Sequence, residues 1–139
     1  MTDRLEFEYV VAQWYAPDDD PRPFVPVRLS YLDRSIEAWA LVDSGADMNV
    51  MPYEIGTDLG LSWEGSAHEF ELQGLVDRFP ARAVAVDLEI ESWPSLKMAF
   101  AWSTQNETPV ILGQWNFFQT VDVCFLRSRW LINLELPFK

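Results

Sequence analysis

The chain has 139 residues, which is enough for one domain with a substantial hydrophobic core, and we expect residues 1–139 to form a single domain. It carries 22 acidic and 10 basic residues, and its formal net charge is -12. Such a charge repels phosphate backbones and anionic lipid surfaces, so it argues against nucleic acid and membranes as partners.

The first predicted element is a strand over Leu5–Tyr15, because apolar and acidic residues alternate through its first half. The acidic, proline-rich segment 16–23 follows. Proline cannot donate to a sheet ladder, so we expect this segment to be an exposed loop.

Two further strands are predicted over Phe24–Leu32 and Ile36–Val42, joined by a short polar connection. The second strand is apolar and leads directly into Asp43. An ionised carboxylate held against packed side chains costs several kcal/mol unless it is hydrogen-bonded or shares a proton. A functional role would explain a carboxylate at this position, so Asp43 is the main candidate for a catalytic residue.

The residues that follow Asp43 are those of a tight turn. Gly45 removes a side chain where the backbone must pass close to the carboxylate, and Ser44 adds a hydroxyl that can brace the turn. Asp-Ser-Gly is also ordinary turn chemistry, in which the carboxylate only caps backbone amides. The motif alone therefore leaves both a structural and a catalytic interpretation open.

The middle of the chain predicts a short strand over 48–52, a brief helix over Tyr53–Leu61 that ends near Gly60, and a long hairpin. The arms of the hairpin are expected at 69–72 and 79–90, with 73–78 between them.

Another strand is predicted over Trp93–Ala101. The apolar segment Val110–Leu112 then enters the core, and it is followed by a short helix over Trp115–Thr120 and by strands over 121–125 and 130–136. The pattern is all-β around one core, without alternating strands and helices.

Two segments together resemble a known family. Ala40-Leu41-Val42-Asp43-Ser44-Gly45-Ala46-Asp47 resembles the catalytic turn of retropepsin-like aspartic proteases, the single-domain retroviral type, and Pro109–Gly113 with the helix after it resembles the segment that follows their flap. The resemblance implies a closed barrel or sandwich with one short C-terminal helix and a flap hairpin. It implies an aspartic endopeptidase acting on peptides, without a cofactor.

By this resemblance Asp43 is the catalytic residue, and because the chain holds one Asp-Ser-Gly, the active form is a homodimer with an Asp43 dyad. The two carboxylates share a proton and activate a water. The resemblance also assigns substrate-binding or supporting roles to eight residues: Ser44, Gly45, Ala46, Asp47, Gly74, Leu75, Val76 and Ile111. The net charge favours basic or neutral peptides over acidic ones.

The chain departs from the viral pattern at two places. Gln114 stands where an arginine pairs with the acid at the position of Asp47, and the expected flap tip has a single glycine. Arg78, Arg82 or Arg127 is a candidate replacement for that arginine. These departures leave a second interpretation open, which is a non-catalytic peptide-binding or assembly module with the same fold. The expected dimer seam consists of the segments Leu5–Val11 and Trp130–Leu136.

Other features of the sequence argue against a zinc site, a membrane-spanning helix and a signal peptide. One histidine, His68, and one cysteine, Cys124, cannot form a zinc site, and Cys124 is expected to be a buried apolar residue. A single cysteine suits a reducing compartment, no apolar run approaches the roughly 20 residues of a spanning helix, and the acidic N-terminus is unlike a signal peptide. We therefore expect a cytoplasmic protein.

Overall fold

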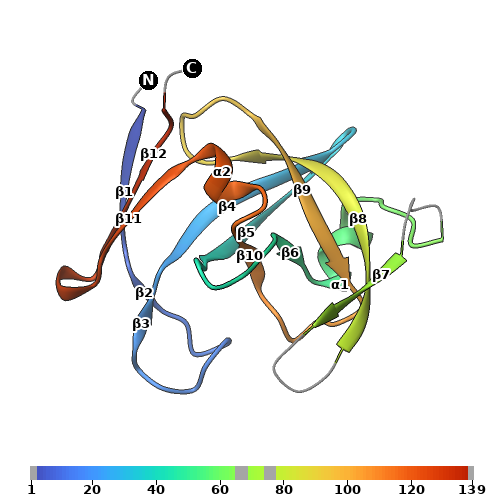
Figure 1. Ribbon diagram of the computed structural model, residues 1–139, viewed down its shortest axis with the longest axis horizontal. Helices are drawn as coiled ribbons and strands as arrows, with labels where there is room; N and C mark the ends of the chain where they lie inside the picture. Colours follow the sequence, from blue (N-terminus) through green and yellow to red (C-terminus); the bar gives the residue numbers. More distant parts are fainter. Residues whose placement is uncertain (1–2, 65–68, 74–77, 138–139) are drawn as a thin grey trace.

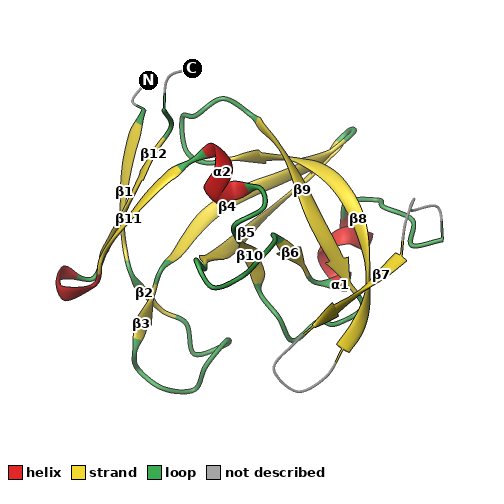
Figure 2. Ribbon diagram, in the orientation of Figure 1, coloured by secondary structure: helices red, strands yellow, loops and turns green. Residues whose placement is uncertain are grey.

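The described residues are mostly β-strand, with two short α-helices and one 3-10 turn among them (Figure 2). The computed structural model describes residues 3–64, 69–73 and 78–137. Its elements are β1 (Arg4–Glu8), β2 (Val10–Val11), β3 (Pro21–Arg22), β4 (Phe24–Tyr31), β5 (Arg34–Val42), β6 (Val50–Met51), α1 (Tyr53–Asp58), β7 (Glu69–Gln73), β8 (Arg78–Glu89), β9 (Leu96–Ser103), β10 (Val110–Leu112), α2 (Phe117–Thr120), β11 (Asp122–Leu126), η1 (Arg127–Arg129) and β12 (Leu131–Glu135).

The central feature is a closed barrel of six strands. Its strands run in the order β4-β5-β10-β6-β9-β8, and β8 pairs back onto β4 to close the wall. Strand β7 pairs antiparallel with β8 and extends the sheet as a hairpin at the side of the barrel (Figure 1). The predicted all-β class, the closed barrel, the short C-terminal helix and the flap-type hairpin are confirmed.

A second sheet lies beside the barrel and contains both ends of the chain (Figure 1). Its order is β1-β12-β11, with β12 in the middle and antiparallel to both neighbours. The Leu136 amide donates to the Asp3 carbonyl at 2.8 Å. The segments expected at the dimer seam therefore pair with each other within one chain, and β1 and β11 form the two edges of this sheet.

The barrel core is closed at the α1 end by aromatic packing. Trp102 is fully buried; it stacks on Tyr53 with ring centroids 5.6 Å apart and meets Trp63 edge to face at 5.1 Å. A Cβ on Gly56 would lie 2.1 Å from the Trp102 Nε1, so a glycine is required in α1 at this position. The predicted helix end is confirmed, since Gly60 has a φ of +83° just beyond α1.

Several predicted boundaries were wrong, and each has a local cause. The first strand does not reach Tyr15, because the amides of Tyr15 and Ala16 both donate to the Ala12 carbonyl in a turn. The loop predicted over 16–23 contains β3, which pairs with β2. Strand β9 begins at Leu96 rather than Trp93, because the Trp93 amide donates to the Ile90 carbonyl in a turn.

Cys124 is exposed rather than buried, because β11 is an edge strand that packs only part of its surface.

In the part of the chain described, neither helix has the length and apolar character needed to cross a membrane.

Candidate active site

Asp43 lies directly after β5, where the strand is held on both sides. Strand β10 runs parallel to β5, with Leu112 opposite Val42, and β4 is antiparallel on the other side. The Asp43 amide donates to the Leu112 carbonyl at 3.0 Å, and the Val42 amide donates to the Pro23 carbonyl at 3.0 Å. The backbone that carries the half-buried Asp43 is therefore fixed by strands from both sides.

The turn after Asp43 orients its carboxylate. The Gly45 amide donates to Asp43 Oδ1 at 2.9 Å, and the Ala46 amide donates to the Asp43 carbonyl at 3.1 Å. A Cβ on Gly45 would lie 3.3 Å from Asp43 Oδ1, so the glycine leaves the carboxylate room. The predicted turn chemistry of Gly45 is confirmed, while both the capping and the catalytic interpretation of Asp43 fit this geometry.

Gln114 connects the turn to the segment that follows β10. Its side-chain Nε2 donates to the Ser44 carbonyl at 2.9 Å, and its backbone amide donates to the Ala46 carbonyl at 2.9 Å. The Trp115 amide donates to the Asp47 carbonyl at 2.9 Å. These three bonds join segments that are far apart in sequence and bring together the two motifs of the sequence analysis.

Asp47 is exposed and makes no ion pair among the residues with described side chains. Arg82 donates to the Trp63 carbonyl and lies over the Trp63 ring, while Arg127 lies over the Trp130 ring. The side chain of Arg78 is outside the described part. Neither Arg82 nor Arg127 therefore replaces the arginine that the resemblance places beside this acid.

Asn49 forms the buried support beneath the turn. Its Oδ1 accepts from the Gly113 amide at 2.8 Å, and its Nδ2 donates to the Ala99 carbonyl at 2.9 Å and to Asn116 Oδ1 at 3.3 Å. The side chain has no exposed surface. One amide group thus fixes the segment after β10, β9 and the start of α2 relative to each other. Our sequence analysis missed Asn49; its signal was a lone amide within the apolar stretch before Met51.

Gly113 is required where these segments cross. A Cβ at this position would lie 2.6 Å from the Met48 carbonyl oxygen and 2.7 Å from the Ala46 carbonyl oxygen, so a side chain must displace backbone. We expect Gly113→Ala to reduce the free energy of unfolding by about 3 kcal/mol, measured by urea denaturation. Gly45→Ala is the matched control, with a smaller loss because its nearest contact is at 3.3 Å. Equal stability of Gly113→Ala and the wild type would contradict this packing.

A pocket of about 400 Å³ opens beside Asp43. It is lined by the end of β5, by residues of the segment 9–23, and by Arg127 from η1. The lining residues are Tyr9, Tyr15, Asp20, Pro21, Arg22, Pro23, Leu41, Val42, Asp43 and Arg127. The hydrogen bond from Arg22 holds the pKa of Asp18 below its usual value, while burial raises the pKa of Tyr9 against an opposing effect of Arg127.

The comparisons with known proteins give a structural relationship only. No protein-family model and no curated protein matches the sequence. The structure is similar to a retropepsin-like aspartic protease from Rickettsia conorii, with a TM-score of 0.69 over 96% of this chain and 99% of that chain, at 10% identity. This chain has the retropepsin-like fold. A second similar structure is EIAV protease in complex with the inhibitor HBY-793, with a TM-score of 0.48, 19% identity, and coverage of 68% of this chain and 84% of that one.

Within this retropepsin-like fold, the other predicted site residues occupy different positions. Ile111 is half-buried in β10 and pairs with Leu41 of β5 and Val50 of β6, so it contributes to the barrel sheet. Gly74, Leu75 and Val76 lie outside the described residues, as does His68.

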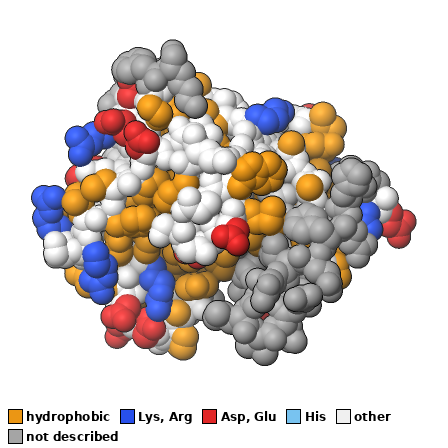
Figure 3. Space-filling view, in the orientation of Figure 1, with side chains coloured by type: hydrophobic (Ala, Val, Ile, Leu, Met, Phe, Trp, Pro, Cys, Tyr) orange, Lys and Arg blue, Asp and Glu red, His pale blue; other side chains and the backbone are white. Residues whose placement is uncertain are grey.

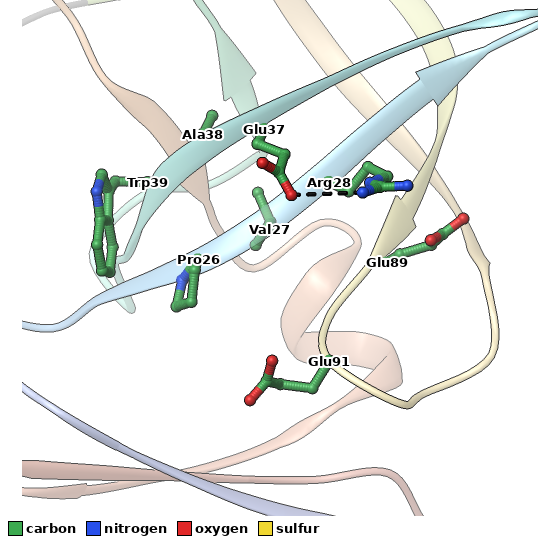
Figure 4. Close-up of a pocket in the computed structure, with 8 residues that line it drawn as sticks. All are labelled: Pro26, Val27, Arg28, Glu37, Ala38, Trp39, Glu89 and Glu91. Atoms are coloured by element: carbon green, nitrogen blue, oxygen red, sulfur yellow. Dashed lines mark hydrogen bonds and ion pairs between the residues drawn. The ribbon is translucent and has the colours of Figure 1, made fainter.

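Another hollow, of about 580 Å³, lies on the outer face of the β4–β5 hairpin (Figure 4). It is lined by Pro26, Val27, Arg28, Glu37, Ala38, Trp39, Glu89 and Glu91. Asp43 is not among them. Arg28 forms an ion pair with Glu37 at 3.4 Å across this hollow. Because Asp43 does not line it, this hollow is not the candidate active site.

The retropepsin-like domain has no metal centre in its described part, where no group of three or more His, Cys, Asp or Glu side chains is placed to hold an ion. The residues around the pocket that sequence reasoning missed are Tyr9, Tyr15 and Arg22, whereas Arg127 was considered there only as a partner for Asp47. These residues come from the segment 9–23 and from η1, and only the chain fold brings them to Asp43.

Proposed function

We propose that this protein is an aspartic endopeptidase that hydrolyses peptide bonds as a homodimer. The observation that carries the proposal is the placement of Asp43. Its carboxylate is held by the Gly45 amide at the end of a fixed strand, and it lines an open pocket in a retropepsin-like fold. A capping carboxylate needs the amide bond but has no need of the pocket.

The chemistry follows from pairing two such carboxylates. Two carboxylates a few ångströms apart are not both ionised, because like charges at that distance repel, so the pair shares one proton. The ionised member takes a proton from a water, while the protonated member donates a hydrogen bond to the scissile carbonyl. When the tetrahedral intermediate collapses, the carboxyl group that took the proton of the water passes it to the leaving nitrogen. The amine then departs without a covalent enzyme intermediate.

The second carboxylate has to come from a second chain, because the sequence contains one Asp-Ser-Gly. Ser44 is exposed beside Asp43, as a contact across a two-fold axis requires. The edges β1 and β11 carry backbone groups with no neighbouring strand in the described sheet, so they are available for pairing with another copy. We assign the dimer seam to this sheet and the turn at 43–47.

Sedimentation equilibrium tests the assembly. We expect a monomer–dimer equilibrium in the micromolar range and hydrolytic activity that rises with the dimer fraction. A protein that stays monomeric at these concentrations yet cleaves peptides would contradict the shared dyad.

A second candidate function is a non-catalytic peptide-binding or assembly module. The specific observation in its favour is that Gln114 donates to the Ser44 carbonyl and Asp47 has no ion-pair partner among the residues with described side chains. Peptide binding without hydrolysis, by either monomer or dimer, would favour this module over the protease.

A further inference from the structure

The pocket beside Asp43 has one wall that is unlike the rest of this acidic protein. Arg127, the first residue of η1, lines it together with Tyr9 and the end of β5. Figure 3 shows basic side chains at the left of this face, over the ends of the β11–β12 and β2–β3 hairpins, with hydrophobic surface between them.

Arg127 is held in place by stacking rather than by a carboxylate. Its guanidinium lies 3.7 Å from the centre of the Trp130 ring, and Trp130 packs edge to face on Tyr9 at 5.8 Å. Stacking of this kind orders the guanidinium and leaves its N–H donors free for a ligand. The opposing effect of Arg127 on the pKa of Tyr9 agrees with a positive charge close to that hydroxyl.

The other charged residues that line the pocket are Arg22, Asp20 and Asp43. Arg22 is neutralised by Asp18, with contacts of 3.0 Å from Nη1 and 3.1 Å from Nη2. Asp20 and Asp43 are the two carboxylates in the wall, and Asp43 accepts from the Gly45 amide. Among the residues with described side chains, Arg127 is thus the pocket cation that has no acidic partner.

We propose that Arg127 is a specificity-determining residue that selects a glutamate or aspartate side chain on the peptide residue next to the scissile bond. The inference rests on the proposed function, since it names the substrate side chain of that same site. An arginine fork binds a carboxylate with two parallel hydrogen bonds, and the pocket volume of about 400 Å³ accommodates such a side chain against Tyr9 and Leu41.

A preference for an acidic side chain is the opposite of what the net charge of -12 favours. The distances of the charged groups from the bound side chain explain why both hold. At physiological ionic strength the Debye length is about 8 Å, so the many distant carboxylates are largely screened from a ligand in the pocket. Arg127, in contact with the ligand, is screened much less. The expectation of basic or neutral peptides therefore applies to the approach of the substrate, and the carboxylate preference applies to one bound side chain.

The test uses two pools of ten-residue peptides of random neutral sequence, identical except that one carries a single fixed glutamate and the other a glutamine. Mass spectrometry identifies the cleaved bonds. We expect the wild type to cleave the glutamate pool about tenfold faster, with glutamate next to the cut, and Arg127→Gln to reduce this ratio to about one. Arg129→Gln, in the same turn but outside the pocket, is the matched control and keeps the ratio. Asp20→Asn removes a competing carboxylate and increases the ratio.

Binding measured by fluorescence anisotropy, with Asp43→Asn protein and the same labelled pools, separates the two proposals. If cleavage shows no glutamate preference, or a preference that persists in Arg127→Gln, the role of Arg127 is overturned. The proposed protease function is unaffected by this outcome. Absence of cleavage by the wild type, with Arg127-dependent binding of the glutamate pool, overturns the protease and supports the carboxylate selectivity of the pocket. If the wild type shows no cleavage and the pools show no selective binding, both proposals are overturned.

Discussion

Asp43→Asn is expected to lower peptide-bond hydrolysis by about three orders of magnitude or more. An amide cannot take the proton from the attacking water, and it cannot share a proton with its mate. The fold is expected to persist, because asparagine keeps an Oδ1 that accepts from the Gly45 amide at the same place. The measurement is kcat/KM on a cleaved peptide, together with the thermal midpoint of unfolding.

Asp33→Asn is the matched control, since Asp33 is exposed at the opposite end of the β4–β5 hairpin. It should leave both quantities at wild-type values. A mixing experiment adds the subunit requirement: excess Asp43→Asn protein should suppress wild-type activity, because each mixed dimer holds a single ionisable carboxylate at the centre. Undiminished turnover by Asp43→Asn would refute the assignment of the catalytic residue.

Asn49→Ala is expected to lower the free energy of unfolding by about 3 kcal/mol. The truncation leaves the Gly113 amide and the Ala99 carbonyl without their partner in the interior, and each such group costs about 1–3 kcal/mol. For a chain of this size, the thermal midpoint should fall by roughly 10 °C. Activity should fall as well, although Asp43 is intact, because Asn49 holds the segment after β10, and that segment bonds the turn through Gln114.

Asn106→Ala provides the comparison for this prediction. Asn106 also accepts a backbone amide, from Glu54 at 2.9 Å, but it is exposed, so water replaces the lost bond. Its loss should stay below about 1 kcal/mol. If the two asparagine variants unfold at the same urea concentration, the buried amide network does not have the role assigned to it.

The turn after Asp43 was predictable because its chemistry is local. An apolar strand that ends in Asp43, followed at once by Gly45, specifies a carboxylate bonded to a turn amide, and the Gly45 amide donates to it as expected. The apolar segment of β10 was equally visible in sequence, and its register beside β5 is the parallel pairing of Leu112 with Val42. The barrel followed from the resemblance, whereas the order in which the strands pair came only from the structure.

What was missed depends on contacts between distant segments. Arg127 and Tyr9 belong to opposite ends of the chain, and nothing in their neighbouring residues indicates that both line the pocket of Asp43. The exposure of Cys124 was missed because alternation along a strand does not reveal whether that strand lies at an edge. Gln114 was expected to replace an arginine and to keep the capacity to donate a hydrogen bond, but its acceptor, the Ser44 carbonyl, was not foreseen.

The parallel pairing of β5 with β10 has a consequence for biosynthesis. Gln114 and Ser44 are 70 residues apart, and contacts of such separation form late because the loop between them must first close. While a ribosome is still translating the segment before β10, the turn at Asp43 lacks the neighbour that fixes it. The turn at Asp43 therefore reaches its final geometry only after the segment that contains β10 and Gln114 has left the ribosome.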